Sequence, residues 1–165
     1  MPQIKNNRVD HVAWMVRPEN HDSTVELLSK IYDMSFEADD GGPEFGLRLT
    51  WSWSAGLEVL SPAGDGPYAQ MCWNYLEKRG EGLFAVVMGV DDVPAAMERA
   101  RALGHEPSPL LSLPETNNAW LKRVQDCTES VLHVFHDQNL AVGRIITDED
   151  GPSIADQRAA LAAAK

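Results

Sequence analysis

The 165-residue sequence has little basic charge and little cysteine. It carries 14 lysine and arginine residues against 25 aspartate and glutamate residues, which gives a formal net charge of -11 at pH 7. Nucleic acids and anionic membrane surfaces are bound through basic patches, so this balance argues against both as partners. The two cysteines, Cys72 and Cys127, have neither the spacing of a metal site nor that of a disulfide framework.

Long apolar runs are missing as well. No stretch approaches the roughly 20 apolar residues that a membrane-spanning helix needs. The polar segment Met1–Arg8 has no apolar signal core, so the cytoplasm is the expected location. The sequence also lacks a glycine-rich phosphate loop, because its paired glycines are typical of turns. With 44% hydrophobic and 24% charged residues, the composition is that of an ordinary folded protein.

What the sequence does contain is a pattern that occurs twice. Val9–Val16 aligns with Leu83–Val90, 74 residues later, and Leu57–Leu60 aligns with Leu132–Phe135, 75 residues later. The first string opens each half of the chain and the second string closes it. Each half therefore predicts one folded module.

Both modules are predicted to have the order β-α-β-β-β, which makes the chain an α+β protein. Alternating and apolar segments predict strands, and apolar residues three and four apart predict helices. The expected strands are 9–16, 34–38, 47–53 and 57–60, then 83–90, one within 105–114, 120–125 and 131–135; the expected helices are 22–32, 68–78 and 93–103. The predicted organisation is a first module at 8–62, a linker and connecting helix at 63–81, a second module at 82–138, and a tail at 139–165 that is helical from Ser153.

The residues at the matched positions are the candidates for chemistry. His11 stands opposite Ala85 in the alignment of the two halves, and Glu58 stands opposite His133. Taken singly, a histidine in a strand is more often structural, and a carboxylate suits the wet face of an antiparallel sheet. The three residues His11, Glu58 and His133 stand at equivalent positions in the two copies of the pattern, and this favours a role as ligands over a structural role. If the modules pack by pseudo-symmetry, His11, Glu58 and His133 converge, and two imidazoles with one carboxylate are a ligand set for a divalent ion. The other histidines are expected at the surface: His21, His105 and His136.

Three strings make the chain resemble a known superfamily. Val9–Val12, Gly56–Pro62, and Tyr75–Leu83 followed by Val90–Val93 are similar to the vicinal oxygen chelate superfamily, which includes glyoxalase I, methylmalonyl-CoA epimerase, extradiol dioxygenases and bleomycin-resistance proteins. The third string looks most like methylmalonyl-CoA epimerase. The resemblance implies two βαβββ modules whose curved mixed sheets form a metal and ligand cleft.

The resemblance also implies where a metal would be held. The family's ligands, carried over position by position, fall on His11, Glu58, Ala85 and His133. Alanine cannot bind a metal, and the epimerase pattern has histidine at 85 and glutamate at 133, so the site is altered. The implied cofactor is one divalent ion (Zn, Fe, Mn, Co or Ni) or none. Glu44 stands where the epimerase-like pattern has a glutamate proposed as a catalytic base.

The leading hypothesis is an enzyme that chelates a substrate with neighbouring oxygens and promotes isomerisation, epimerisation or lyase chemistry through an enolate. Glu44 would move the proton. Two histidines and a carboxylate are also typical of a ring-cleaving dioxygenase. The alternative of another class is a metal-free protein that binds a small molecule such as a drug. The residues expected to contact a ligand are Trp51, Trp53, Trp73, Phe84 and Ala85. A homodimer is expected, because open sheets leave edges to cover.

Overall fold

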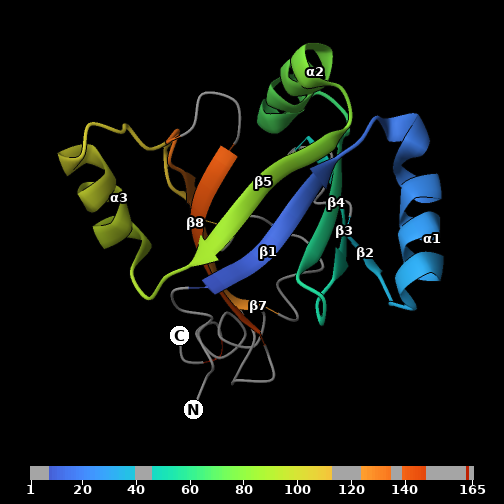
Figure 1. The fold of residues 1–165 in the computed structure, drawn as a ribbon, viewed down its shortest axis with the longest axis horizontal. Helices are drawn as coiled ribbons and strands as arrows, with labels where there is room; N and C mark the ends of the chain where they lie inside the picture. Colours follow the sequence, from blue (N-terminus) through green and yellow to red (C-terminus); the bar gives the residue numbers. More distant parts are fainter. Residues whose placement is uncertain (1–7, 40–45, 113–123, 135–138, 148–162, 164–165) are drawn as a thin grey trace. The chain divides into compact units, whose positions relative to one another are not determined.

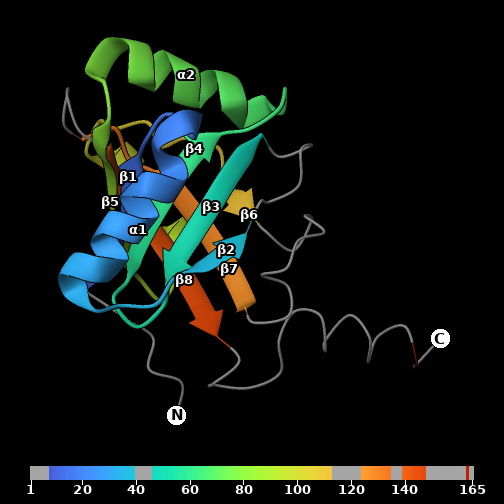
Figure 2. The same cartoon turned by 90° about the vertical axis from the view of Figure 1, so that its right-hand side faces the viewer.

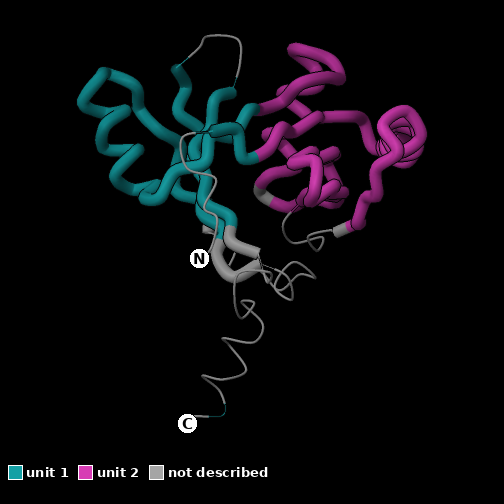
Figure 3. Tube along the Cα trace, turned by 60° about the horizontal axis from the view of Figure 1, so that its bottom comes forward, with its two compact units in different colours: residues 1–10, 86–165 teal, residues 11–85 magenta. Residues whose placement is uncertain are grey.

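The computed structural model describes residues 8–39, 46–112, 124–134, 139–147 and 163. The chain divides into two compact units (Figure 3). Unit 2 is His11–Ala85, and unit 1 comprises Met1–Asp10 and Val86–Lys165. The division falls within two strands, the first and the fifth, so each of these strands supplies residues to both units.

Unit 2 contains the first β-α-β-β-β series. In chain order its elements are β1 (Arg8–Met15), the short 3-10 helix η1 (Pro18–Asn20), α1 (His21–Tyr32), β2 (Glu37–Asp39), β3 (Leu47–Ser52), β4 (Leu57–Pro62), α2 (Pro67–Arg79) and the start of β5 (Gly82–Gly89) (Figure 1). Its strand order is β2-β3-β4-β1-β5. β4 pairs antiparallel with β3 and parallel with β1, so it occupies the middle of this sheet.

Helix α2 contacts the sheet of unit 2 through a narrow apolar stripe, whereas the buried residue of α1 is His21. Both α1 and α2 pack against β4 (Figure 1, Figure 2). Ala69, Cys72 and Leu76 of α2 are buried, at a spacing of three and four residues that places them on one helical face. No helix in the described ranges is both long enough and apolar enough to cross a membrane.

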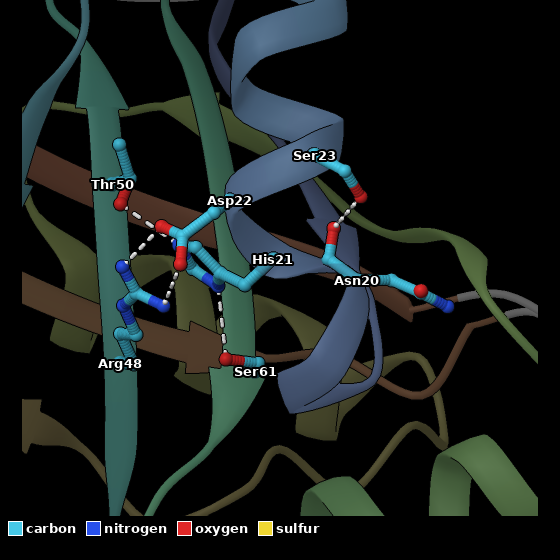
Figure 4. A network of polar contacts seen from close by, with 7 residues as sticks. All are labelled: Asn20, His21, Asp22, Ser23, Arg48, Thr50 and Ser61. Atoms are coloured by element: carbon cyan, nitrogen blue, oxygen red, sulfur yellow. Dashed lines mark hydrogen bonds and ion pairs between the residues drawn. The ribbon is translucent and has the colours of Figure 1, made fainter.

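A buried polar network ties α1 to the sheet of unit 2 (Figure 4). The two ring nitrogens of His21 lie 2.9 Å from Ser61 Oγ and 2.8 Å from Thr50 Oγ1. Arg48 on β3 forms two hydrogen bonds with the carboxylate of Asp22, the next residue of α1. The expectation that His21 lies at the surface is wrong, because its side chain is fully buried. The two hydroxyls provide the partners that a buried imidazole needs.

Unit 1 contains the second β-α-β-β-β series. It takes the end of β5 and continues with α3 (Val93–Ala102), β6 (Leu111–Ser112), β7 (Val124–Val131) and β8 (Asn139–Thr147). The strand order is β5-β8-β7-β6, with β7 antiparallel to β6 and β8. The buried residues of α3 pack with Leu132 and Val142. The predicted α+β class, with two modules of the same element order, is confirmed.

The end of the second module differs from the prediction. The sequence predicts its last strands at 120–125 and 131–135 and a tail from 139, but the structure has strands at Val124–Val131 and Asn139–Thr147. The module therefore extends to Thr147. β7 ends at Val131, and His133, two residues later, has a φ of 32°, in the left-handed region that a strand does not adopt. The predicted tail helix lies outside the described residues apart from Ala163.

The cap at the start of α3 can be tested by substitution. The Asp92 side chain accepts a hydrogen bond of 2.8 Å from the Ala95 backbone N–H and caps the helix. We expect Asp92→Ala to lower the free energy of unfolding by about 1 kcal/mol, measured by urea denaturation. Asp92→Asn is the matched control, since asparagine caps equally well. Equal losses in both variants would mean that the cap is not what stabilises this helix.

Candidate functional site

Two of the predicted ligands, His11 and Glu58, lie together in unit 2. β1 and β4 are parallel neighbours, and Ala13 pairs with Glu58 in their register. Because side chains alternate along a strand, His11 and Ala13 share the face on which Glu58 lies. His11 Nε2 is 3.8 Å from Glu58 Oε2, and the two residues are 2% and 7% exposed. The structure therefore brings this imidazole and this carboxylate together.

The carboxylate of Glu58 also affects the pKa of the Cys72 thiol on α2. Burial, and after it the negative charge of Glu58, raises the pKa of the Cys72 thiol to about 12. The thiol is fully buried and stays protonated at neutral pH. Cys72 is thus a core residue beside the pair and not a nucleophile, in line with the sequence.

Two tryptophans adjoin the pair on the same face. Trp51 of β3 is the cross-strand neighbour of Glu58, and its ring makes a T-shaped contact with the His11 ring, with centroids 4.7 Å apart. Trp53 stacks on Trp51 at 5.1 Å with an interplanar angle of 12°. Trp53 Nε1 donates a hydrogen bond of 3.2 Å to Glu37 Oε2. Trp51 is buried and Trp53 is half-buried, so the aromatic series runs from the pair toward solvent.

The remaining predicted ligand-contact residues lie on α2 and β5: Trp73, Phe84 and Ala85. Phe84 of β5 packs edge-on against Tyr75 of α2, with ring centroids 5.0 Å apart. Tyr75 is held by a hydrogen bond from its hydroxyl to the Leu83 carbonyl. Trp73 is half-buried on α2, and Ala85 is buried in β5. The structure therefore joins Trp51 and Trp53 to the His11–Glu58 pair, whereas Phe84 contacts Tyr75 of α2.

His133 does not lie in the strand predicted for it. It lies in unit 1, after the end of β7, in a segment outside any strand, and its side chain is exposed. The predicted strand around it is absent from the described residues 124–134. Glu44, the predicted base, and His136 lie outside the described residues.

The backbone hydrogen bonds identify the true counterpart of Glu58. Val16 N–H donates to the Leu60 carbonyl in the first module, and Val90 N–H donates to the Gly143 carbonyl in the second. Val16 and Val90 are equivalent in the sequence repeat, so Leu60 corresponds to Gly143. Two residues earlier on each strand, Glu58 corresponds to Ala141, which is 4% exposed. Leu140–Val142 matches Leu57–Val59 in its first and last residues, and this similarity is the signal that the sequence comparison missed.

The donor set does not fit the metal site that the resemblance implies. The four equivalent positions carry His11, Glu58, Ala85 and Ala141, and only two of these side chains can ligate an ion. Protein sites for ions such as Zn²⁺ use three or four protein ligands. Within the described part of the chain, no group of three or more His, Cys, Asp or Glu side chains could hold a metal ion. What the pair can do by itself is accept and donate a proton.

Comparison with known proteins gives structural matches only. No protein-family model and no curated protein matches the sequence. Methylmalonyl-CoA epimerase from Mycobacterium tuberculosis is similar over 87% of this chain and 91% of its own, with a TM-score of 0.58 and 16% identity. A variant of the Streptomyces coelicolor methylmalonyl-CoA epimerase, in complex with 2-nitronate-propionyl-CoA, is similar over 84% and 96%, with a TM-score of 0.58 and 20% identity. A hypothetical protein from Bacillus halodurans C-125 is similar over 82% and 92%, with a TM-score of 0.60 and 16% identity. The chain therefore has the fold of the methylmalonyl-CoA epimerases, which belong to the vicinal oxygen chelate superfamily.

Proposed function

We propose that the chain is an enzyme that moves a proton at a carbon next to a carbonyl group of a small-molecule substrate, which is epimerase or isomerase chemistry. The observation that carries the proposal is the buried contact between His11 and Glu58 on neighbouring strands. Burying an ionisable pair costs free energy, so such a pair in the middle of a sheet is a candidate for a functional role. The shared fold with proteins named as epimerases supports the same class of reaction.

The pair supplies both groups that this reaction requires. The Glu58 carboxylate accepts the proton from the carbon, and the electrons of the broken C–H bond move into an enolate whose charge lies on the former carbonyl oxygen. An N–H of His11 donates a hydrogen bond to that oxygen. Return of the proton from Glu58 to the same carbon restores the substrate, and exchange results when the Glu58 proton has first been replaced from solvent. Delivery of a proton to the opposite face of the enolate gives the epimer, and delivery to the neighbouring carbon gives the isomer. Since both residues are almost fully buried, the enolate would be stabilised in a site with little competing water.

Exchange of the substrate proton with solvent tests the proposal without knowledge of the product. Acyl thioesters, 2-oxo acids and 2-hydroxy ketones are incubated with the protein in D₂O, and loss of the α-proton signal is followed by NMR. We expect enzyme-dependent exchange that falls by about 10²-fold or more in Glu58→Gln and in His11→Gln. His105→Gln is the matched control, because His105 lies in unit 1 beyond the end of α3. Exchange that persists in both variants would refute the proposal.

The same assay decides whether Glu44 is the base, as the sequence predicts. If Glu44→Gln abolishes exchange while Glu58→Gln retains it, the proton is taken by Glu44 and the role proposed for Glu58 is wrong. If Glu58→Gln abolishes exchange and Glu44→Gln does not, the buried carboxylate is the base. Both variants keep the size of the side chain and remove only its charge, so a difference between them reports on chemistry.

A second candidate function is binding of a planar small molecule without turnover. The stack of Trp51 and Trp53 favours it, because a half-buried indole can add a further aromatic group to the series. Saturable quenching of tryptophan fluorescence, with no proton exchange for any substrate of the panel, would identify a binding protein. The expected homodimer and cytoplasmic location stay predictions.

A further inference from the structure

We infer that the His11–Glu58 pair acts without a divalent metal ion, because the two strand positions that would complete a family-type ligand set are alanines. The catalytic part of this inference rests on the proposed function, whereas the part that concerns metal binding can be tested by itself. The sequence repeat already places Ala85 opposite His11. The new observation is the hydrogen bond from Val90 to Gly143, which replaces His133 by Ala141 as the counterpart of Glu58.

Both alanines lie in well-defined strands. Ala85 is 5% exposed and Ala141 is 4% exposed. The residues at the equivalent positions of the first module, His11 and Glu58, are also buried, at 2% and 7% exposed. Ala141 pairs with Val131 in an uninterrupted stretch of the β7–β8 ladder. A shift by one residue would turn the side chains of β8 to the opposite face, so the register leaves little freedom for another residue to take this position. A methyl group has no lone pair and cannot ligate an ion.

The residues around the pair do not supply the missing donors. Ala13 and Trp51 flank Glu58 on the two neighbouring strands, and Trp51 also makes a T-shaped contact with the His11 ring. Within the described residues, no third His, Cys, Asp or Glu side chain joins the pair in a group that could hold a metal ion. The surroundings therefore suit a proton-transfer pair better than a coordination sphere.

Metal content and metal binding test the inference directly. The full-length protein is purified without a chelator and without a histidine tag, and its metals are measured by mass spectrometry. It is then titrated with Zn²⁺ and with Co²⁺ while heat, Co²⁺ absorption and the thermal midpoint of unfolding are recorded. We expect far less than one equivalent of metal per chain, no saturable binding that depends on Glu58, and no change in the midpoint.

One equivalent of ion per chain, lost in both His11→Gln and Glu58→Gln, would overturn the inference. His133→Gln then separates two explanations: loss of the ion in that variant would establish the three-ligand site predicted from the sequence repeat, and retention would mean that other residues complete the site. A variant at His105 serves as the control for loss of a histidine remote from the pair in sequence.

A chelator separates this inference from the proposed function. Proton exchange that is unaffected by EDTA supports both. Exchange that is abolished by EDTA and restored by one ion overturns the metal-free mechanism but leaves the proposed reaction intact. A protein that neither binds metal nor exchanges a proton leaves the inference about ligand positions standing and refutes the proposed function.

Discussion

Gly46→Ala is expected to lower the free energy of unfolding by roughly 2–5 kcal/mol. Gly46 is buried just before β3, with a φ of 80°. A Cβ added there would lie 2.8 Å from the backbone N of Ala69 and 2.8 Å from two backbone atoms of Gly66, where α2 begins. The left-handed backbone costs an alanine about 1–2 kcal/mol. Relief of the collision requires movement of the helix start, which adds about 1–3 kcal/mol.

Gly104→Ala is the matched control for this prediction. Gly104 has a φ of 86°, close to that of Gly46, but no atom lies within 4 Å of the position of its Cβ. It should therefore show only the backbone cost of about 1–2 kcal/mol. Urea denaturation of both variants measures the difference. Equal losses of the free energy of unfolding in the two variants would show that Gly46 does not lie tightly against α2. A wild-type rate of substrate proton exchange in Gly46→Ala would show that the start of α2 can move without displacing the His11–Glu58 pair.

The second large effect is a loss of stability in acid that depends on His21. Burial, and after it the positive charge of Arg48, lowers the pKa of His21 to about 4, while Asp22 acts in the opposite direction. In the unfolded chain the ordinary pKa is about 6.5. Between pH 6.5 and pH 4 the unfolded state therefore binds a proton that the folded state does not, and stability falls as the pH is lowered. The full contribution of the lowered His21 pKa to the change in the free energy of unfolding is about 3 kcal/mol.

Denaturation of the wild type and of His21→Gln at pH 7 and at pH 4 measures this contribution. Glutamine keeps a donor and an acceptor for Ser61 and Thr50 but does not titrate, so its loss of stability between the two pH values should be smaller by about 3 kcal/mol. Carboxylates that titrate in this range affect both proteins alike and cancel. An equal pH dependence in the two proteins would mean that His21 is protonated as readily in the folded state as in the unfolded one.

Local patterns were enough to predict the architecture and the first half of the site. The strand that carries His11 and the short strand that carries Glu58 each show apolar neighbours, and the helix after His11 shows apolar residues at helical spacing. Repetition of this series in the second half predicted two modules of the same order. These signals depend on residues a few positions apart, because side chains alternate in strands and recur every three or four residues in helices. The convergence of His11 with Glu58 was predicted on the condition that the two modules pack by pseudo-symmetry.

The strand that carries His133 was predicted wrongly for a reason that the same signals cannot reveal. Leu132–Phe135 and Leu140–Gly143 are both short apolar strings, and either could complete the module. The structure chooses the second, because β8 extends to Thr147 and pairs along most of β7, whereas His133 interrupts the first. The histidine that seemed equivalent to Glu58 is thereby replaced by Ala141.

The amino-acid order by itself determined the α+β class, the duplicated β-α-β-β-β series and the presence of an imidazole and a carboxylate in strands that meet. Only the tertiary structure decided that the counterpart of Glu58 is Ala141, that His21 is buried against Ser61 and Thr50, and that Gly46 lies against the start of α2. The physical reason is that strand register and helix packing are set by hydrogen bonds and contacts between segments far apart in the chain, and such contacts leave no periodic trace in the sequence.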